Sequence, residues 1–392
     1  MKIALVISGL GVHGGTEKVF LKLAEDLRDK NENVQLYTFD YKPKKTYKEF
    51  SSFRIRACEP LADNSRSGHI INVFRRVKQS WSLLSMVDKD TDIMNIHDHE
   101  CFWLHVFAKI FRPKMKMVWQ INDLHVCFRV GPLHDAKPSW KHPIQRSMMR
   151  IAASMADAVT VHVMKNKKRV DKYYRVNSHL YYPGVDMLET CPHPRHFTYP
   201  LTLLSTGVLF PYRNYEVIIR AMAVLKMQGI DSRLTVVGST QHSQDYAESL
   251  VALARELQVN MTLAGEISDG ELKQQHDESD IFIFPNLDQS WGLASFEAMS
   301  ASIPSIVSES AGAAELLTGR EGACIVDATS PEKVAEAVLD ITSSQEEYEK
   351  LCIGAFNTVA SMTWPNMYCK DMRNLFHQLC SEQVGGNIHV RE

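Results

Sequence analysis

The residues with the clearest chemical potential lie between a short apolar run and the helix pattern that follows it. Ile281–Phe284 has the pattern of a buried strand, and the loop after it carries Trp291 and Gly292. A helical pattern opens near Leu293, and the start of a helix presents backbone N–H groups that attract phosphate. Glu297 follows about one turn later, where its carboxylate can reach the same ligand. The sequence therefore predicts an anion-binding site at this junction.

A second strand pattern repeats the arrangement. Ser305–Ser308 ends at Glu309, and the small-residue segment 310–315 precedes another helix. Two strand-to-helix crossovers that open on one edge of a parallel sheet form a nucleotide-binding crevice. We therefore expect the two loops to line one nucleotide site.

The N-terminal residues also open with a strand, a turn and a helix. Residues 2–7 have the pattern of a buried strand, Thr16 is positioned to cap the following helix, and residues 34–39 form the next strand pattern. Residues 9–14 match the G-x-G-x-x-G dinucleotide fingerprint, and Asp40 is near the expected acidic position. A lone fingerprint is a weak signal, so a nicotinamide-type cofactor stays an alternative for this segment alone.

Other polar groups end strands or lie between elements. Asp88-Lys89-Asp90 has the Asp-x-Asp form of metal-dependent sugar transfer, but its place in a polar link favours a solvated charge run. His97-Asp98-His99 lacks a further metal ligand at a recognised spacing, which favours hydrogen-bonding loop residues. Asn122 and His125 follow the strand pattern 117–121, so they also belong to a carboxyl edge.

The pattern divides the 392 residues into two α/β units. Residues 41–68 are expected to form a long loop or an irregular hairpin, and 69–87 and 165–175 are expected to be basic helices. Pro192, Pro194 and Pro200 mark a linker, after which strands and helices alternate again. The expected strands of the second unit are 203–206, 233–237, 261–263, 281–284 and 305–308, and its first expected helices are 215–227, 246–257 and 269–276. A last helix is expected after Trp364.

Charge and cysteine content limit the partners. The net charge is −2, but residues 1–190 hold 31 Lys and Arg against 20 Asp and Glu, and the remainder holds 13 against 26. The two halves therefore either dock through opposite charge, or the basic half meets an anionic partner such as lipid or glycan phosphate. The eight cysteines show no metal-binding or disulfide spacing, which indicates reduced thiols in a cytoplasmic protein. No apolar stretch approaches the roughly 20 residues that cross a bilayer, so any membrane contact is expected to be peripheral.

Nearly the whole chain resembles the retaining glycosyltransferases of family 4, which have the two-domain GT-B fold. The motifs that carry the likeness are 14–17, 183–186, 207–214, 265–268, and 289–297 with Pro304. The resemblance implies two Rossmann-like parallel-sheet domains facing across a cleft. Residues 1–190 would bind the acceptor and 191–363 the sugar nucleotide, and 364–392 would supply a helix that crosses back to the first domain.

The resemblance also implies roles for individual residues. Glu297 matches the glutamate that holds the ribose hydroxyls, and Arg213 takes the place of the usual diphosphate-binding lysine. Backbone donors to the phosphate and sugar are expected at Gly292, Leu293 and Ala294. Gly14 and Gly15 match the loop that approaches the phosphate from the first domain.

Four positions depart from the family pattern. Gln289 replaces the first glutamate of Glu-x7-Glu, which removes a negative charge but keeps a hydrogen-bonding group. Val208 replaces a common arginine, and Ser302 replaces a common glycine. Asn122 stands where many relatives have a histidine, with His125 as a substitute. We count Gln289, Arg213, Asn122 and His125 as the candidate catalytic residues.

These features predict a metal-independent retaining glycosyltransferase without a cofactor. It would move a hexose from a UDP- or GDP-sugar to a glycan or lipid-linked acceptor, as in the synthesis of surface polysaccharides or glycoconjugates. Expected partners include the anionic inner face of a membrane but no nucleic acid. The alternatives are a non-catalytic GT-B partner subunit, suggested by Gln289, Val208 and Asn122, and a GT-B sugar-nucleotide epimerase or phosphorylase. A nicotinamide-dependent oxidoreductase would leave residues 289–315 unexplained.

Overall fold

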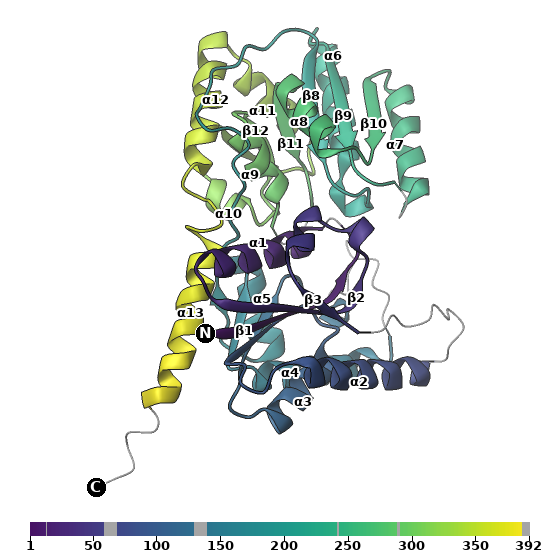
Figure 1. Ribbon diagram of the computed structural model, residues 1–392. Helices are drawn as coiled ribbons and strands as arrows, with labels where there is room; N and C mark the ends of the chain where they lie inside the picture. Colours follow the sequence, from purple (N-terminus) through teal and green to yellow (C-terminus); the bar gives the residue numbers. More distant parts are fainter. Residues whose placement is uncertain (13, 59–68, 129–138, 241–242, 288–290, 386–392) are drawn as a thin grey trace. The chain divides into compact units, whose positions relative to one another are not determined.

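The computed structural model describes residues 1–12, 14–58, 69–128, 139–240, 243–287 and 291–385 (Figure 1). Contacts among these residues divide the chain into two units. The first comprises the chain up to Gly184 together with the residues from Trp364, and the second comprises Val185–Thr363. Each unit has one parallel β-sheet with helices on both faces, which is the α/β arrangement predicted from the alternating pattern.

In the described part of the first unit, seven parallel strands pair in the order β3-β2-β1-β4-β5-β6-β7. The strands are β1 (Lys2–Leu10), β2 (Asn33–Tyr41), β3 (Ile55–Ala57), β4 (Ile93–His97), β5 (Lys116–Ile121), β6 (Ala158–Val161) and β7 (His179–Leu180). The central strands are buried on both faces, which explains why they form nearly continuous apolar runs. The strand order reverses between β1 and β4, so a crevice for a ligand is expected at their carboxyl ends.

The two faces of this sheet differ in polarity. The helices of the unit are α1 (Gly15–Asp29), η1 (Pro43–Lys45), η2 (Lys48–Ser52), α2 (His69–Met86), α3 (Phe102–Phe111), η3 (Val126–Phe128), α4 (His142–Met155), α5 (Met164–Tyr174) and α13 (Tyr368–Gly385). Side chains of α2 to α5 share one apolar core with the sheet. On the other face, the ring of Phe20 in α1 packs against His97, and Tyr368 in α13 packs against His162.

The last helix belongs to the first unit, as the sequence predicted. The hydroxyl of Tyr368 donates to Oε1 of Gln120 in β5 at 3.2 Å. Arg373 forms an ion pair with the buried carboxylate of Asp26 in α1. These contacts hold α13 against α1 and the sheet.

Three local expectations for the first unit were wrong. Residues 41–58 form two short 3-10 helices and the parallel edge strand β3 instead of a loop or hairpin, while 59–68 lie outside the described residues. Helix α1 begins at Gly15 with Gly14 as its N-cap, so Thr16 lies inside the helix. Helix α3 was not expected at all.

Within the described residues, the second unit has six parallel strands in the order β10-β9-β8-β11-β12-β13. The strands are β8 (Leu201–Thr206), β9 (Ser232–Val237), β10 (Asn260–Gly265), β11 (Ile281–Phe284), β12 (Ser305–Ser308) and β13 (Ala323–Val326). The helices are η4 (Pro211–Arg213), α6 (Tyr215–Met227), α7 (Gln244–Glu256), α8 (Asp269–Glu278), α9 (Leu293–Ser300), α10 (Ala314–Leu317), α11 (Pro331–Ile341) and α12 (Gln345–Val359). Here the order reverses between β8 and β11.

No helix in the described parts of the chain is both long enough and apolar enough to span a bilayer.

Candidate active site

The loop between β11 and α9 is shaped by a glycine. Gly292 has φ 134°, and a Cβ atom there would lie 2.8 Å from the ring of Phe284 and 3.3 Å from Cβ of Ala313. It is the N-cap of α9 and brings no capping side chain. Leu293 and Ala294 form the first turn, whose N–H groups have no partner within a helix. Only glycine fits this close approach, and it leaves the helix start open to an anion.

The neighbouring Trp291 contacts both α9 and the loop after β12. The ring of Trp291 stacks on Phe296, with centroids 4.9 Å apart and planes 9° apart. Its carbonyl accepts from the N–H of Ala313 at 3.1 Å, in the loop after β12. The two loops therefore lie together, as their spacing predicted. Gln289, a candidate catalytic residue, lies outside the described residues.

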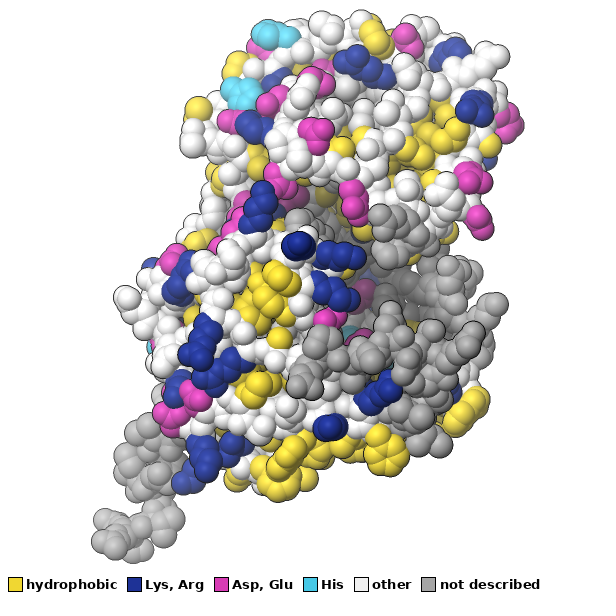
Figure 2. All heavy atoms as spheres, turned by 45° about the vertical axis from the view of Figure 1, so that its right-hand side comes forward, with side chains coloured by type: hydrophobic (Ala, Val, Ile, Leu, Met, Phe, Trp, Pro, Cys, Tyr) yellow, Lys and Arg dark blue, Asp and Glu magenta, His cyan; other side chains and the backbone are white. Residues whose placement is uncertain are grey.

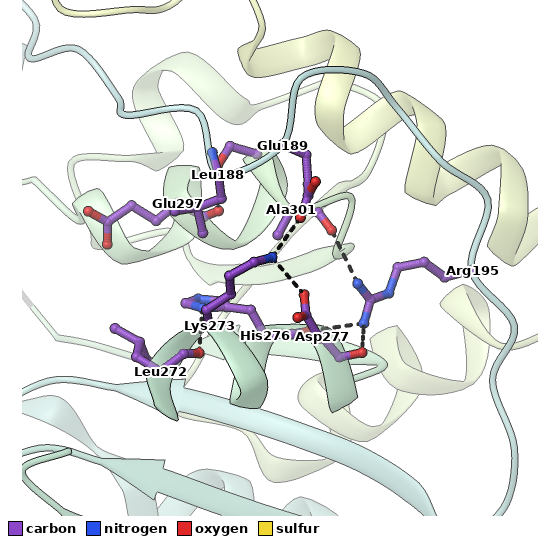
Figure 3. Close-up of polar contacts among 10 residues, drawn as sticks. Leu188, Glu189, Arg195, Leu272, Lys273, His276, Asp277, Glu297 and Ala301 are labelled. Carbon is purple, nitrogen blue, oxygen red and sulfur yellow. Dashed lines mark hydrogen bonds and ion pairs between the residues drawn. The ribbon is translucent and has the colours of Figure 1, made fainter. Parts of the chain in front are cut away.

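Glu297 lies in the middle of α9 and is half-buried. Its carboxylate points away from Lys273 and Arg195 in the close-up (Figure 3). The imidazole of His276 in α8 is buried, which lowers its pKa, and the charge of Glu297 acts in the opposite direction. The hydroxyl of Ser300 donates to the carbonyl of Glu297 at 2.7 Å.

The carboxyl end of α9 is fixed by the linker that follows the first unit. The N–H of Leu188 donates to Oγ of Ser300 at 3.1 Å, and the N–H of His193 donates to Oγ of Ser302 at 3.3 Å. Ser302 has φ 58°, a left-handed conformation that favours glycine. Its hydroxyl gives this serine a contact with the linker that glycine lacks.

Arg195 in the same linker binds the ends of two helices (Figure 3). Its guanidinium donates to the carbonyls of His276, Asp277, Ser279 and Ala301 at 2.9, 2.7, 2.8 and 3.3 Å. A cation at helix carboxyl ends is favourable because the carbonyls there are unpaired within the helix. Lys273 adds ion pairs with Glu189 at 2.9 Å and Asp277 at 3.3 Å. No motif in the sequence marked Arg195.

Arg213 lies at the same edge of the second sheet. It ends η4, and its Nη1 would be 2.9 Å from a Cβ atom at Gly207, the residue after β8. Nε of Arg213 is buried without a hydrogen-bond partner among the described residues. The carbonyl of Tyr212 accepts from the N–H of Leu287 at 2.8 Å, which joins this turn to the loop after β11. The structure thus brings Arg213, Gly292, Leu293, Ala294 and Glu297 to one sheet edge, at the reversal between β8 and β11.

In the first unit, Gly14 and Gly15 lie where β1 leads into α1. Gly14 is the N-cap, and its carbonyl accepts from the hydroxyl of Tyr47 at 3.2 Å. Gly9, the first glycine of the dinucleotide fingerprint, lies inside β1 and pairs in register with Asp40. Asp40 in turn forms an ion pair with Lys42 at 3.0 Å. The fingerprint therefore lacks its usual geometry, because its first glycine is part of the strand and does not form the turn.

Asn122 follows β5 and contacts His162, which follows β6. Nδ1 of His162 is 3.0 Å from the carbonyl of Tyr181, so it carries the proton. Burial lowers the pKa of His162 to about 4, so the ring is neutral and Nε2 is an acceptor. Oδ1 of Asn122 lies 2.9 Å from Nε2, which would oppose two acceptors. Rotating the amide by half a turn exchanges its oxygen and nitrogen and gives an N–H···N hydrogen bond.

After this rotation, the oxygen of Asn122 takes the position that Nδ2 had before. An atom at this position is buried and has no hydrogen-bond partner among the described residues. Gln120 also donates to Nε2 of His162, at 3.2 Å. His162 therefore sets the orientation of Asn122. The sequence analysis did not single out His162, although a polar residue directly after an apolar strand can indicate a functional position.

His125 contacts a different set of side chains from Asn122. Its Nδ1 accepts from the N–H of Cys127 at 3.2 Å, and its ring centroid is 5.5 Å from that of His99. The ring of His99 contacts the hydroxyl of Tyr174 at 3.0 Å. Asn122 and His125 are thus close in sequence but have different partners.

Both polar groups near β4 have ion-pair or hydrogen-bond partners among the described residues. Asp88 and Asp90 pair with Lys2 at 3.1 and 2.7 Å, and Asp88 also pairs with Arg56 at 3.2 Å. The carboxylate of Asp98 accepts from the N–H of Ser8 at 2.9 Å, and burial raises its pKa to about 6. No set of three or more His, Cys, Asp or Glu side chains in the described segments is arranged to hold a metal ion.

Two units, each with one parallel sheet whose strand order reverses, have the architecture of the GT-B class. A family model described as "Glycosyltransferase Family 4" matches residues 13–187, and one described as "Glycosyl transferases group 1" matches residues 193–356. Together the matches cover most of the chain. The chain belongs to glycosyltransferase family 4 and has the GT-B fold.

Individual relatives agree with this assignment. A GDP-mannose-dependent alpha-(1-6)-phosphatidylinositol monomannoside mannosyltransferase of Mycobacterium tuberculosis is 25% identical over 268 residues, 62% of this chain and 67% of that protein. The O-antigen chain mannosyltransferase RfbU of Salmonella typhimurium is 25% identical over 246 residues, 60% of this chain and 65% of that protein. Among solved structures, sucrose-phosphate synthase from Thermosynechococcus elongatus has a TM-score of 0.75 at 16% identity, covering 97% of this chain and 100% of that chain. The protein is a glycosyltransferase.

Proposed function

We propose that this protein transfers a hexose from a GDP- or UDP-sugar to a glycan or lipid-linked acceptor, with retention of configuration and without a metal ion. The observation that carries the proposal is the gathering of Arg213, the open start of α9 and Glu297 at one sheet edge. The family model and the mannosyltransferase relatives support glycosyl transfer. GDP-mannose is the first donor to test, because the Mycobacterium tuberculosis relative is named for its dependence on it.

The chemistry follows from the charges at this edge. Departure of a nucleoside diphosphate develops negative charge, which a guanidinium and oriented N–H groups stabilise. Arg213 would bind the diphosphate together with the N–H groups of Leu293 and Ala294, and Glu297 would accept hydrogen bonds from the ribose hydroxyls. Gln289 would bind the sugar through its amide. Asn122 and His125 would serve the acceptor side, and Gly14 and Gly15 the phosphate.

The donor is identified by thermal unfolding in the presence of GDP, UDP or NAD. A nucleotide at about 100 times its Kd stabilises the folded state by about 2.7 kcal/mol. We expect GDP or UDP to raise the unfolding temperature and NAD to have no effect. A response to NAD alone would overturn the proposal, and nucleotide binding without sugar transfer to any acceptor would favour the non-catalytic alternative.

The ribose-binding role of Glu297 can be tested with a single substitution. In Glu297→Ala the ribose loses a charged acceptor, so the Kd for the nucleotide should rise by about tenfold or more, since a hydrogen bond to a charged group is worth about 1.5–3 kcal/mol. Isothermal titration with GDP and UDP measures this. Glu336→Ala, an exposed position in α11 of the same unit, is the matched control and should bind normally. Equal affinities for both variants would remove Glu297 from the ribose role.

The proposal includes peripheral contact with the anionic inner face of a membrane, where a lipid-linked acceptor would lie.

A further inference from the structure

A buried layer of polar side chains lies between the last helix of the first unit and the sheet. Gln120 in β5 and Thr160 in β6 are paired in register, and both side chains are fully buried. His162 follows β6, and the ring of Tyr368 in α13 packs on its imidazole with centroids 5.2 Å apart. We name these four residues the polar layer. The surface of this unit carries many Lys and Arg side chains (Figure 2), whereas the polar layer is uncharged and must find its hydrogen-bond partners inside the protein.

The hydrogen bonds of the polar layer have one consistent direction. His162 is neutral and donates through Nδ1 to the carbonyl of Tyr181, so its Nε2 accepts. Nε2 of His162 lies 3.2 Å from the amide nitrogen of Gln120, which donates to it. Turning this amide around would place its oxygen against the accepting nitrogen. The amide oxygen of Gln120 must therefore face away from His162.

Two hydroxyl groups hold the oxygen of the Gln120 amide. Oε1 accepts from the hydroxyl of Thr160 at 2.5 Å and from that of Tyr368 at 3.2 Å. An amide oxygen has two lone pairs, so it can accept both hydrogen bonds. Burial raises the pKa of Tyr368 well above its usual value, which keeps the proton on the hydroxyl that donates it. The amide of Gln120 is thus held at both ends.

Two amides converge on Nε2 of His162. The amide atom of Asn122 that faces this nitrogen is 2.9 Å from it, and the amide nitrogen of Gln120 is 3.2 Å from it. A ring nitrogen of a neutral imidazole has one lone pair, so the two amides share it. A movement of Gln120 therefore changes the hydrogen bond that is left for Asn122.

We propose that Tyr368 is a positioning residue for Asn122. Its hydroxyl fixes the amide of Gln120, and Gln120 together with His162 then holds the amide of Asn122 in the orientation needed for transfer. Tyr368 reaches this place because the residues from Trp364 return to the first unit. The inference rests on the proposed function, which gives Asn122 a part in transfer. The hydrogen bonds themselves need no substrate, so they are measured separately from transfer.

A purely structural role for Tyr368 predicts a different result. A hydroxyl that only helps to dock α13 would add stability and leave Asn122 unaffected. Tyr348 in α12 of the second unit provides the matched control, because it is as fully buried and donates to the carbonyl of Asp280 at 2.9 Å. Phenylalanine at either position removes one buried hydroxyl and keeps the ring.

The first measurement is nitrogen NMR of the full-length protein without substrate, with isotope label in the ring nitrogens of histidine. The Nε2 signal of His162 is the one that disappears in His162→Gln. Tyr368→Phe should shift this signal, because a displaced Gln120 changes the hydrogen bonds that Nε2 accepts. Tyr348→Phe should leave the signal unchanged. No shift in Tyr368→Phe, or equal shifts in both variants, would overturn the inference.

Steady-state kinetics then test whether Tyr368 acts through Asn122. In Tyr368→Phe, kcat should fall by about fivefold, which corresponds to about 1 kcal/mol for one hydrogen bond. The KM for the sugar nucleotide should not change, and Tyr348→Phe should keep kcat near the wild-type value. Residues of one hydrogen-bond network have non-additive effects. Asn122→Ala should therefore lower kcat, and adding Tyr368→Phe to it should lower kcat no further.

The outcomes of this cycle separate the inference from the proposed function. A loss from Tyr368→Phe that is as large in Asn122→Ala as in the wild type would overturn the inference, because Tyr368 would then not act through Asn122. An unchanged kcat in Asn122→Ala would contradict the proposed role of Asn122 and the inference together, whereas an unchanged His162 signal overturns the inference alone. Circular dichroism checks folding. If Tyr368→Phe unfolds, Gln120→Met replaces it and should give the same shift and the same lack of additivity.

Discussion

The neutral imidazole of His162 fixes the orientation of the Asn122 amide, because only the amide nitrogen can donate a hydrogen bond to Nε2 of His162. The imidazole is neutral and donates through Nδ1 to Tyr181, so its other nitrogen accepts. Replacing His162 by Phe removes this acceptor. If Asn122 takes part in transfer as proposed, kcat should fall by about fivefold, since a hydrogen bond is worth about 1 kcal/mol and about 1.4 kcal/mol changes a rate tenfold. The KM for the sugar nucleotide should not change.

Steady-state kinetics of two further variants separate positioning from general damage. In His162→Gln the side-chain carbonyl can accept from Asn122, so part of kcat should return. His105→Phe alters a fully buried histidine against Trp119, on the other face of the same sheet, and should leave kcat near the wild-type value. Equal losses in the Phe and Gln variants of His162, or a change only in KM, would contradict the positioning role.

At the scale of the element, the start of α9 depends on Gly292. Gly292→Ala forces a Cβ atom against Phe284 in a backbone conformation that alanine rarely adopts, so it should destabilise the second unit by about 1–3 kcal/mol. The shifted helix start should also weaken nucleotide binding. Urea unfolding and nucleotide titration measure the two effects. Gly270→Ala in α8, where a Cβ atom meets nothing within 4 Å, is the control, and similar behaviour of the two variants would refute this account.

Most strands of both sheets could be predicted from the sequence because parallel strands buried on both faces are short apolar runs. Helix α3 was missed because its sequence, FWLHVFAKIF, has little polar face and its N-cap, Cys101, forms no capping hydrogen bond. Strand β3 was missed because it has three residues in a polar segment and exists through its pairing with β2.

Some residues of the candidate site could be predicted from the sequence and others could not. Gly292 and Glu297 were predicted because each lies at a fixed place in a strand-to-helix junction, whereas Arg213 was predicted from the resemblance to family 4. Arg195 could not be predicted, because its carbonyl partners at the carboxyl end of α8 are 81 to 84 residues away and become neighbours only in the folded chain. Its role depends on packing, and spacing within a motif cannot reveal that.

At the scale of the whole molecule, the net charge of −2 hides a basic first half and an acidic second half. In the first unit, the three helices α2, α3 and α4 contain no Asp or Glu. Positive charge and exposed apolar area thus occur on the same helices.

The first unit should also lose stability in acid. Burial lowers the pKa of His97 to about 3, with a smaller contribution from His162, and lowers those of His105 and His162 to about 4. Each group is protonated more readily in the unfolded chain, so its contribution is complete above about pH 6.5 and is lost as pH falls toward 4. Asp98 acts in the opposite direction, because burial raises its pKa to about 6 and its protonation favours the folded state. Protonation of the three histidines destabilises the unit and protonation of one carboxyl stabilises it, so the free energy of unfolding of the unit should fall in acid.

Amide hydrogen exchange in β4 and β5, measured from pH 7.5 to pH 4.5 and corrected for the intrinsic exchange rate, reports this loss as falling protection. His105→Phe removes one of the three groups, so its protection should fall less steeply with pH, whatever its stability at neutral pH. His196→Phe, at an exposed position in the second unit, should keep the wild-type slope. Protection that stays constant over this range, or equal slopes in wild type and His105→Phe, would show that the buried histidines do not control the acid stability of this unit.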